Sequence, residues 1–214
     1  MKIVCLIPAR GGSKRIKNKN IVDINGKPLL AHAIEKCKKV GLIDEVWVST
    51  DDKQIAKVAK EYRAKVHKRP PELSQDKTPS GDVMVDFAEK NEFSMMIMHE
   101  CTSPMTTTED IEQMILKFLN DDYDSMLSLI NVPYYFWEIR KNIAKPISYT
   151  LDSVPITQEY LGHNIEKGGL YIISRDVLLR ERKKLGGKIG YFLIEHFNID
   201  IDSEEDVNVV RKLL

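Results

Sequence analysis

Short apolar segments alternate with amphipathic helical segments along most of this chain. Residues 2–7 are almost continuously apolar, as expected for a parallel strand covered on both faces. A helical stripe of apolar residues follows between Pro28 and Gly41. Further strands are predicted at 45–50, 64–67, 95–99, 125–130 and 168–173, and further helices after Asp52, at 80–90, at 107–119, at 175–184 and after Ser203. The alternation predicts one α/β domain over residues 1–214, built on a doubly wound sheet.

The alternation breaks between residues 132 and 167. This stretch contains three prolines, several β-rich pieces and the aromatic run Tyr134-Tyr135-Phe136-Trp137. Four consecutive aromatic residues cannot all face one core, so some are expected to be exposed or to meet a partner. We therefore predict a β-rich excursion that packs on a second subunit.

Composition restricts the partners. The 32 basic residues balance the 32 acidic ones, so no global charge favours nucleic acid or an anionic membrane. No stretch approaches the roughly 20 apolar residues of a membrane span. The apolar segment at the N-terminus is shorter than that of a signal peptide, because the cationic residues from Arg10 to Lys19 interrupt it. The three cysteines lack zinc-site spacing, and the five histidines show no ligand spacing either. The expected location is the cytoplasm, with the cysteines as buried free thiols.

The first predicted strand runs directly into a glycine-containing basic loop. Pro8-Ala9-Arg10-Gly11-Gly12-Ser13-Lys14 is followed by further cations through Lys19. Glycines allow backbone N–H groups to approach an anion closely, and clustered cations supply the countercharge. The loop matches neither a Walker A motif nor a dinucleotide fingerprint. Its position at the carboxyl end of the first strand favours a triphosphate site, and the alternative is a solvated basic loop.

A second informative segment lies near the C-terminus. Asp200 and Asp202 are two residues apart, so in an extended strand their side chains point to the same face. Two such carboxylates predict a Mg²⁺ site. The alternative is that these acids only precede and cap the last helix, where Ser203 and Asp206 match a capping box. A triphosphate loop and a Mg²⁺ pair together indicate nucleotidyl transfer, in which an acceptor oxygen attacks the α-phosphorus and pyrophosphate leaves.

At this point the motifs match a known family. Ile7–Lys14 with Lys19-Asn20 resembles the start of the cytidylyltransferases that make CMP-activated nonulosonic acids, the CMP-sialic acid synthetase (acylneuraminate cytidylyltransferase) group, related to the CMP-Kdo synthetases. Further matches occur in the same order over nearly the whole chain, at 26–29, 48–51, 68–73, 102–104 and 199–202. The resemblance implies a Rossmann-like, mostly parallel sheet with helices on both faces, of the nucleotide-diphospho-sugar transferase type. It also implies a homodimer whose 132–167 excursion reaches the partner's sugar site.

The resemblance further implies Mg²⁺-dependent transfer of CMP from CTP to a sialic-acid-like sugar, for surface glycan or flagellar glycosylation precursors. Its implied catalytic residues are Arg10, Lys19, Asp200 and Asp202, of which Asp200 and Asp202 bind the metal. The implied nucleotide-binding residues are Ala9, Arg10, Gly11, Gly12, Ser13, Lys14, Lys19, Asn20, Arg69 and Ser80. The implied sugar-binding residues are Glu100, Thr102, Ser103, Gln158 and Lys167. Local alternatives are that Asn20 caps a turn and Ser80 caps a helix.

The sugar half departs from the family pattern. Glu100 stands where the sialic acid enzymes have Gln, Thr157 replaces the Arg of an Arg-Gln pair, and Ile165 and Lys167 replace an Arg and an Asn. Because guanidinium groups bind carboxylates with two parallel bonds, these changes disfavour a substrate carboxylate unless Lys167, Arg140 or Lys141 substitutes. A second interpretation is therefore nucleotidyl transfer to another acceptor, such as a sugar phosphate. A third is a non-catalytic nucleotide-binding dimer, which the presence of Arg10, Asp200 and Asp202 disfavours.

Overall fold

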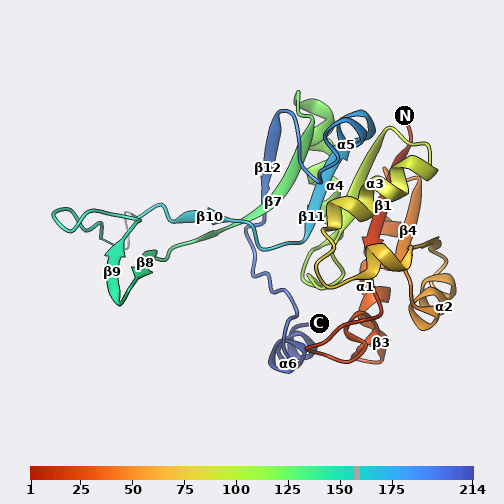
Figure 1. Cartoon of the computed structure of the whole chain (residues 1–214), viewed down its shortest axis with the longest axis horizontal. Coiled ribbons are helices and arrows are strands. Elements are labelled where there is room, and N and C mark those ends of the chain that lie inside the picture. Colours follow the sequence, from red (N-terminus) through yellow and green to blue (C-terminus); the bar gives the residue numbers. More distant parts are fainter. Residues whose placement is uncertain (157–159) are drawn as a thin grey trace.

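A computed structural model describes residues 1–156 and 160–214. Its centre is an eight-stranded sheet in the order β10-β7-β11-β6-β1-β4-β5, with β12 also paired to β7 (Figure 1). The strands are β1 (Ile3–Pro8), β4 (Glu45–Thr50), β5 (Lys65–Lys68), β6 (Met95–His99), β7 (Ser125–Val132), β10 (His163–Ile165), β11 (Leu170–Ser174) and β12 (Ile189–Leu193). Only β10 and β11 run antiparallel to their neighbours. The predicted mostly parallel α/β fold is confirmed.

Helices cover both faces of this sheet. One face carries α1 (Leu29–Lys39), α2 (Lys53–Glu61) and α4 (Thr108–Asn120), and the other carries α3 (Ser80–Lys90) and α5 (Arg175–Glu181). Side chains of β1 alternate between the two cores, with Ile3, Cys5 and Ile7 on the α1 side and Val4 and Leu6 on the α3 side. This burial on both faces explains why β1 is apolar at every position.

A third, smaller core joins the two ends of the chain. The terminal helix α6 (Glu204–Leu213) packs Val207 and Val210 against Ile16, Ile24 and Leu29. Ile24 belongs to the short hairpin of β2 (Asp23–Ile24) and β3 (Lys27–Pro28), and Ile16 and Leu29 lie before and after it in the sequence. The remaining elements outside the arm are two 3₁₀ turns, η1 (Lys19–Ile21) and η2 (Pro71–Ser74). This packing holds the segment before α6 beside the N-terminal basic loop.

The excursion leaves the body as a long arm (Figure 1). Its tip is the hairpin of β8 (Trp137–Arg140) and β9 (Ile143–Pro146), and β10 returns along β7. Part of the aromatic run packs locally, because the ring of Tyr135 contacts those of Tyr149 and Tyr160. The arm also exposes large apolar side chains, including Tyr134, Trp137, Ile139, Ile143, Ile147, Leu151 and Leu161. The predicted β-rich excursion is present, and its contact with a second subunit stays a prediction.

The predicted elements differ from the observed ones at several ends. The strand predicted to start at Gly168 begins at Leu170, because Gly168 and Gly169 have φ angles of +87° and +107°, which do not fit a strand. The helix predicted to reach residue 184 ends at Glu181, where Arg182 adopts a left-handed conformation. The segment with Asp200 and Asp202 belongs to no strand, and β12 was not predicted. Among the described residues, no helix carries an apolar stretch long enough to cross a membrane.

Candidate active site

A cavity of about 550 Å³ lies at one edge of the sheet. Strands β1, β4, β5 and β6 are mutually parallel, so the segments that follow them meet at the same edge. The cavity is lined by residues that follow β1, β5 and β6, by the start of α3 and by the segment before α6: Pro8, Arg10, Ser13, Lys14, Arg15, Ile16, Lys19, Asn20, Arg69, Asp76, Thr78, Ser80, Val83, Glu100, Cys101, Thr102 and Asp202. Most of the residues assigned above to the nucleotide therefore line one cavity.

Gly11 packs the basic loop against the start of α2. The Gly11 N–H donates to Asp51 Oδ1 at 3.0 Å, so this amide already has a partner. A Cβ on Gly11 would lie 2.8 Å from Asp52 Cβ, which leaves no room for a side chain. Asp52 is itself fixed, because its Oδ1 accepts from the N–H groups of Gln54 and Ile55 and so caps α2. Ala9 is likewise buried, and its N–H donates to the Ser49 carbonyl.

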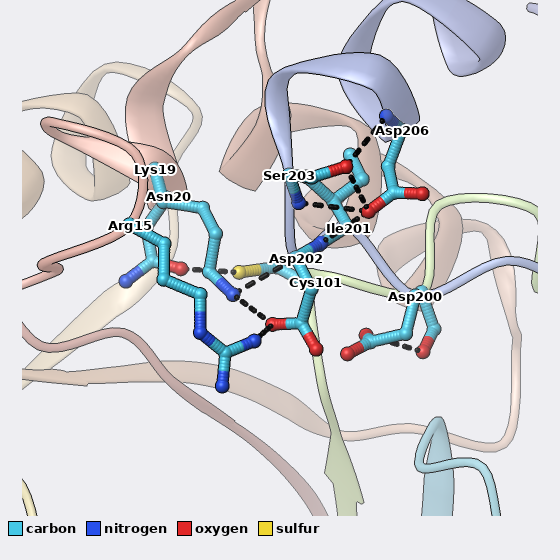
Figure 2. A network of polar contacts seen from close by, with 10 residues as sticks. Arg15, Lys19, Asn20, Cys101, Asp200, Ile201, Asp202, Ser203 and Asp206 are labelled. Atoms are coloured by element: carbon cyan, nitrogen blue, oxygen red, sulfur yellow. Dashed lines mark hydrogen bonds and ion pairs between the residues drawn. The ribbon is translucent and has the colours of Figure 1, made fainter.

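The cations of the loop pair with two carboxylates of the chain. Arg10 Nη1 lies 2.7 Å from Asp76 Oδ1, and Lys14 contacts the other oxygen of the same carboxylate. Hydrogen bonds from Lys14 and Arg10 hold the pKa of Asp76 below its usual range. Lys19 donates to the Ile201 carbonyl at 2.8 Å and lies 3.2 Å from Asp202 (Figure 2). An entering anion therefore has to compete with internal carboxylates for these cations.

Asn20 links the basic loop to the segment after β6. It is buried, and its Nδ2 donates to the Arg10 carbonyl at 2.9 Å. Its Oδ1 accepts from Cys101 Sγ at 3.3 Å (Figure 2). One amide thus holds both walls of the cavity. Its role toward phosphate or ribose stays a prediction.

Arg69 is a buried cation in the cavity wall. Its Nε donates to Ser49 Oγ at 3.1 Å and its Nη2 donates to the Ser49 carbonyl at 2.8 Å. Burial lowers the pKa of Arg69 to about 10, so the group remains a cation near neutral pH. Ser80 is the first residue of α3 and also lines the cavity, but it makes no capping bond, because the cap position is Pro79.

The two predicted metal ligands have different surroundings. The Asp202 carboxylate lies between Arg15, at 2.8 Å, and Lys19 (Figure 2). Burial opposes ionisation of Asp202, but these two cations outweigh it and lower its pKa. Asp200 accepts a hydrogen bond from Ser103 at 3.3 Å, and burial, aided by the charge of Asp202, raises its pKa. The Ser203–Asp206 capping box is also present, so the last helix is capped without the side chains of Asp200 and Asp202.

The residues assigned to the sugar are not all in one place. Glu100 and Thr102 line the main cavity, whereas Ser103 is buried and does not line it. Burial and the neighbouring Asp200 raise the pKa of Glu100, against a hydrogen bond from the Gly169 N–H. Lys167 donates to the Asn198 carbonyl at 3.1 Å and lines a separate cavity of about 450 Å³ between β7 and residues 193–198. Gln158 lies outside the described residues.

Seven of the lining residues were not assigned to the site from the sequence, and three of them carry charged or hydroxyl side chains: Arg15, Asp76 and Thr78. Arg15 was visible within the basic run. Asp76 and Thr78 belong to the polar segment before α3, whose composition indicates only a loop. Among the described residues, no three His, Cys, Asp or Glu side chains are grouped closely enough to form a metal site by themselves.

A mostly parallel sheet with a basic glycine loop at its carboxyl edge is the arrangement of the Rossmann-like nucleotidyltransferases. The fold is similar to a solved CMP:2-keto-3-deoxy-manno-octonic acid synthetase complexed with CTP, with a TM-score of 0.77, 23% identity and coverage of 100% of this chain and 98% of that one. The sequence model of the cytidylyltransferases matches residues 4–147. The chain belongs to the cytidylyltransferase family.

Two curated relatives extend this similarity along the chain. The N-acylneuraminate cytidylyltransferase of Oncorhynchus mykiss is 33% identical over 216 residues, which cover 98% of this chain and 50% of the relative. The post-translational flagellin modification protein B of Campylobacter coli is 29% identical over 223 residues, which cover 100% of this chain and 95% of the relative. The chain therefore spans about half the length of the N-acylneuraminate cytidylyltransferases it matches.

Proposed function

We propose that this protein transfers CMP from CTP to a nonulosonic sugar and releases pyrophosphate. The observation that carries the proposal is one cavity with cations of the 10–19 loop on one wall and Asp202 on another. An acceptor oxygen bonds to the α-phosphorus while the bond from that phosphorus to the bridging oxygen breaks, and the acceptor proton passes to solvent. Arg10 and Lys14 stabilise the charge that develops on the leaving pyrophosphate. The product serves as a precursor for surface or flagellar glycans.

Mg²⁺ fits the donor set of this cavity. Asp200 and Asp202 offer hard oxygen ligands. Burial is the main cause of the raised pKa values of Glu100 and Asp200, and repulsion from Asp200 and from Asp202, respectively, adds to it. A divalent cation relieves that repulsion, and Mg²⁺ is commonly held by one or two carboxylates together with substrate phosphates. Asp200 and Asp202 would hold the ion, which supplies charge neutralisation at the phosphates. Before the metal binds, Lys19 and Arg15 lower the pKa of Asp202 and so keep this ligand ionised.

The residues expected to contact the acceptor sugar depart from the family pattern. Glu100 presents a carboxyl group where the family pattern has an amide, and Lys167 is engaged by Asn198. Arg140 and Lys141 lie at the tip of the arm, remote from the cavity of their own chain (Figure 1). These cations can therefore meet a substrate carboxylate only in the cavity of a second copy. A sugar with an amino group suits Glu100, and a sugar phosphate is the second candidate acceptor.

The arm supports a homodimer as the functional unit. Ile139 and Ile143 on its terminal hairpin are 75% and 71% exposed, and further exposed apolar side chains occur along the rest of the arm. An exposed apolar surface of this kind is typical of a protein–protein contact. A second copy covers that surface and receives the arm's basic tip beside its own cavity.

Pyrophosphate release tests the proposal. The protein is incubated with Mg²⁺ and each of the four nucleoside triphosphates, against sialic, legionaminic and pseudaminic acids, Kdo and several sugar phosphates. We expect release with CTP and one nonulosonic acid only. Release with a sugar phosphate alone would support the second acceptor class, and CTP binding without any release would support a non-catalytic nucleotide-binding dimer.

A further inference from the structure

A chain of buried polar groups runs from the cavity wall into the α3 side of the sheet. It begins at Arg69 and passes through Ser49 on β4 and His67 on β5, which are paired residues of adjacent strands. It ends at Asp86 in the middle of α3. Ser49 is fully buried, and His67 and Arg69 are 6% and 5% exposed. Groups buried this deeply are fixed by their partners, because water is not available to replace a lost hydrogen bond.

The direction of each hydrogen bond follows from the chemistry of the groups. A guanidinium only donates, so Ser49 Oγ accepts from Arg69 Nε at 3.1 Å. The Ser49 hydroxyl proton is then free for His67 Nδ1, which lies 3.0 Å away. The neutral ring therefore carries its own proton on Nε2, which faces Asp86 Oδ2 at 3.0 Å.

The contact between His67 Nε2 and Asp86 Oδ2 joins a neutral ring to a carboxylate and is not aligned as a hydrogen bond. Neither His67 Nε2 nor Asp86 Oδ2 has another hydrogen-bond partner among the described residues. The other carboxylate oxygen of Asp86, Oδ1, pairs with Lys90 one turn further along α3, at 2.5 Å. Burial lowers the pKa of His67, which keeps the ring neutral near pH 7 and preserves the order of donors.

Two of the five guanidinium N–H donors of Arg69 are thus used by Ser49. Nε and Nη2 bond to Ser49, so the plane of the guanidinium is set by β4. Arg69 lines the cavity together with Ser80, the first residue of α3. The same helix carries Asp86, which contacts His67. The orientation of the cationic face toward the nucleotide is determined by residues that line no part of the cavity.

We propose that Ser49, His67 and Asp86 are positioning residues that orient Arg69 toward the nucleoside part of CTP. This inference rests on the proposed function and on the role that the family resemblance implies for Arg69, a nucleotide-binding residue near the cytosine. Its consequence is selective: loss of the chain weakens binding of the nucleoside part and leaves binding of the phosphate groups intact.

Equilibrium binding of CTP and of inorganic triphosphate to the intact protein tests this inference. We expect Ser49→Ala to raise the Kd of CTP about tenfold, in line with the loss of a buried hydrogen bond, and to leave the Kd of inorganic triphosphate within about twofold. Ser49→Thr restores the hydroxyl and is expected to restore CTP binding. Asp86→Asn should act in the same direction. Glu89→Gln removes a carboxylate of the same helix that pairs with Arg182, outside this chain of groups, and should not.

Three outcomes are decisive. Unchanged CTP binding in both Ser49→Ala and Asp86→Asn, with weaker CTP binding in Arg69→Met, overturns the positioning role and leaves the proposed function standing. Equal losses for CTP and inorganic triphosphate in Ser49→Ala also overturn it, because they indicate a general distortion of the cavity. Unchanged CTP binding in Arg69→Met overturns both the positioning role and the placement of Arg69 near the base.

Discussion

Replacing Gly11 by alanine tests how the phosphate loop is built. The new Cβ would lie 2.8 Å from Asp52 Cβ and 3.0 Å from Asp52 Oδ2, whereas ordinary contacts begin at 3.4 Å. Relief therefore requires a movement of about 0.6 Å, taken either by the loop or by Asp52. Asp52 resists, because it holds the N-terminal cap of α2 through two hydrogen bonds of 2.7 and 2.9 Å. The φ angle of Gly11 is not in the left-handed region, so space alone decides the outcome.

The magnitude follows from these contacts. Overpacking costs about 1–3 kcal/mol, and loss of an N-cap costs about 0.5–2 kcal/mol. We expect Gly11→Ala to lower the free energy of unfolding by about 2 kcal/mol. For a chain of this size that corresponds to a fall in Tm of roughly 4–8 °C. Because the loop also carries Arg10 and Lys14, the Kd of CTP should rise as well.

Differential scanning calorimetry of a matched pair measures this effect. At Gly12 the nearest atom to a new Cβ is Arg10 Nη1, at 3.6 Å, which is an ordinary contact. Gly12→Ala should therefore keep the Tm of the unmodified protein or raise it slightly, since alanine restricts the unfolded chain. A Gly11→Ala protein that melts within about 1 °C of Gly12→Ala would refute the close packing of the loop on α2.

Three further predictions concern charge and assembly. Asp76→Asn should lower the Kd of CTP severalfold in calorimetric titration, because the triphosphate no longer competes with that carboxylate for Arg10 and Lys14; an unchanged or higher Kd would show that the pairing persists in the complex. Asp202→Asn should abolish most Mg²⁺-dependent pyrophosphate release with only a small fall in Tm, since the capping box of α6 does not use this side chain and its ion pairs with Arg15 and Lys19 involve a half-exposed carboxylate; full turnover would exclude Asp202 as a metal ligand. Ile139→Asp should shift sedimentation velocity profiles toward monomer, because it places a charge in the exposed apolar surface of the arm; an unchanged profile would place the subunit contact elsewhere.

Signals that act over a few residues were read correctly from the sequence. The two capping boxes, Thr107–Asp110 and Ser203–Asp206, are both formed, because each involves residues only three positions apart. The helix at Ser80–Lys90 and the strand at Met95–His99 were predicted with their observed bounds. The predicted start of the strand at Gly168 was wrong, because the positive φ angles of Gly168 and Gly169 cannot be recognised from residue type alone.

Contacts between distant residues were not accessible in the same way. Asp76 meets Arg10 across 66 positions of sequence, and the segment around it carries only the composition of a loop. His67 shows no ligand spacing, and only the pairing of β4 with β5 places it beside Ser49. Strand β12 is short and contains Gly190, so its pairing to β7 depends on packing that its own residues do not specify.

The sequence by itself determined the α/β class, the basic loop after β1 and the acidic segment before α6, because periodicity, glycine content and charge are local properties of the chain. Only the tertiary structure decided that Lys19 and Asp202 meet, that Ser49 binds the guanidinium of Arg69, and that Lys167 and Glu100 line different cavities. The physical reason is that these relations depend on which strands become neighbours and which side chains lose access to water. Both are set by the packing of the whole domain around its sheet.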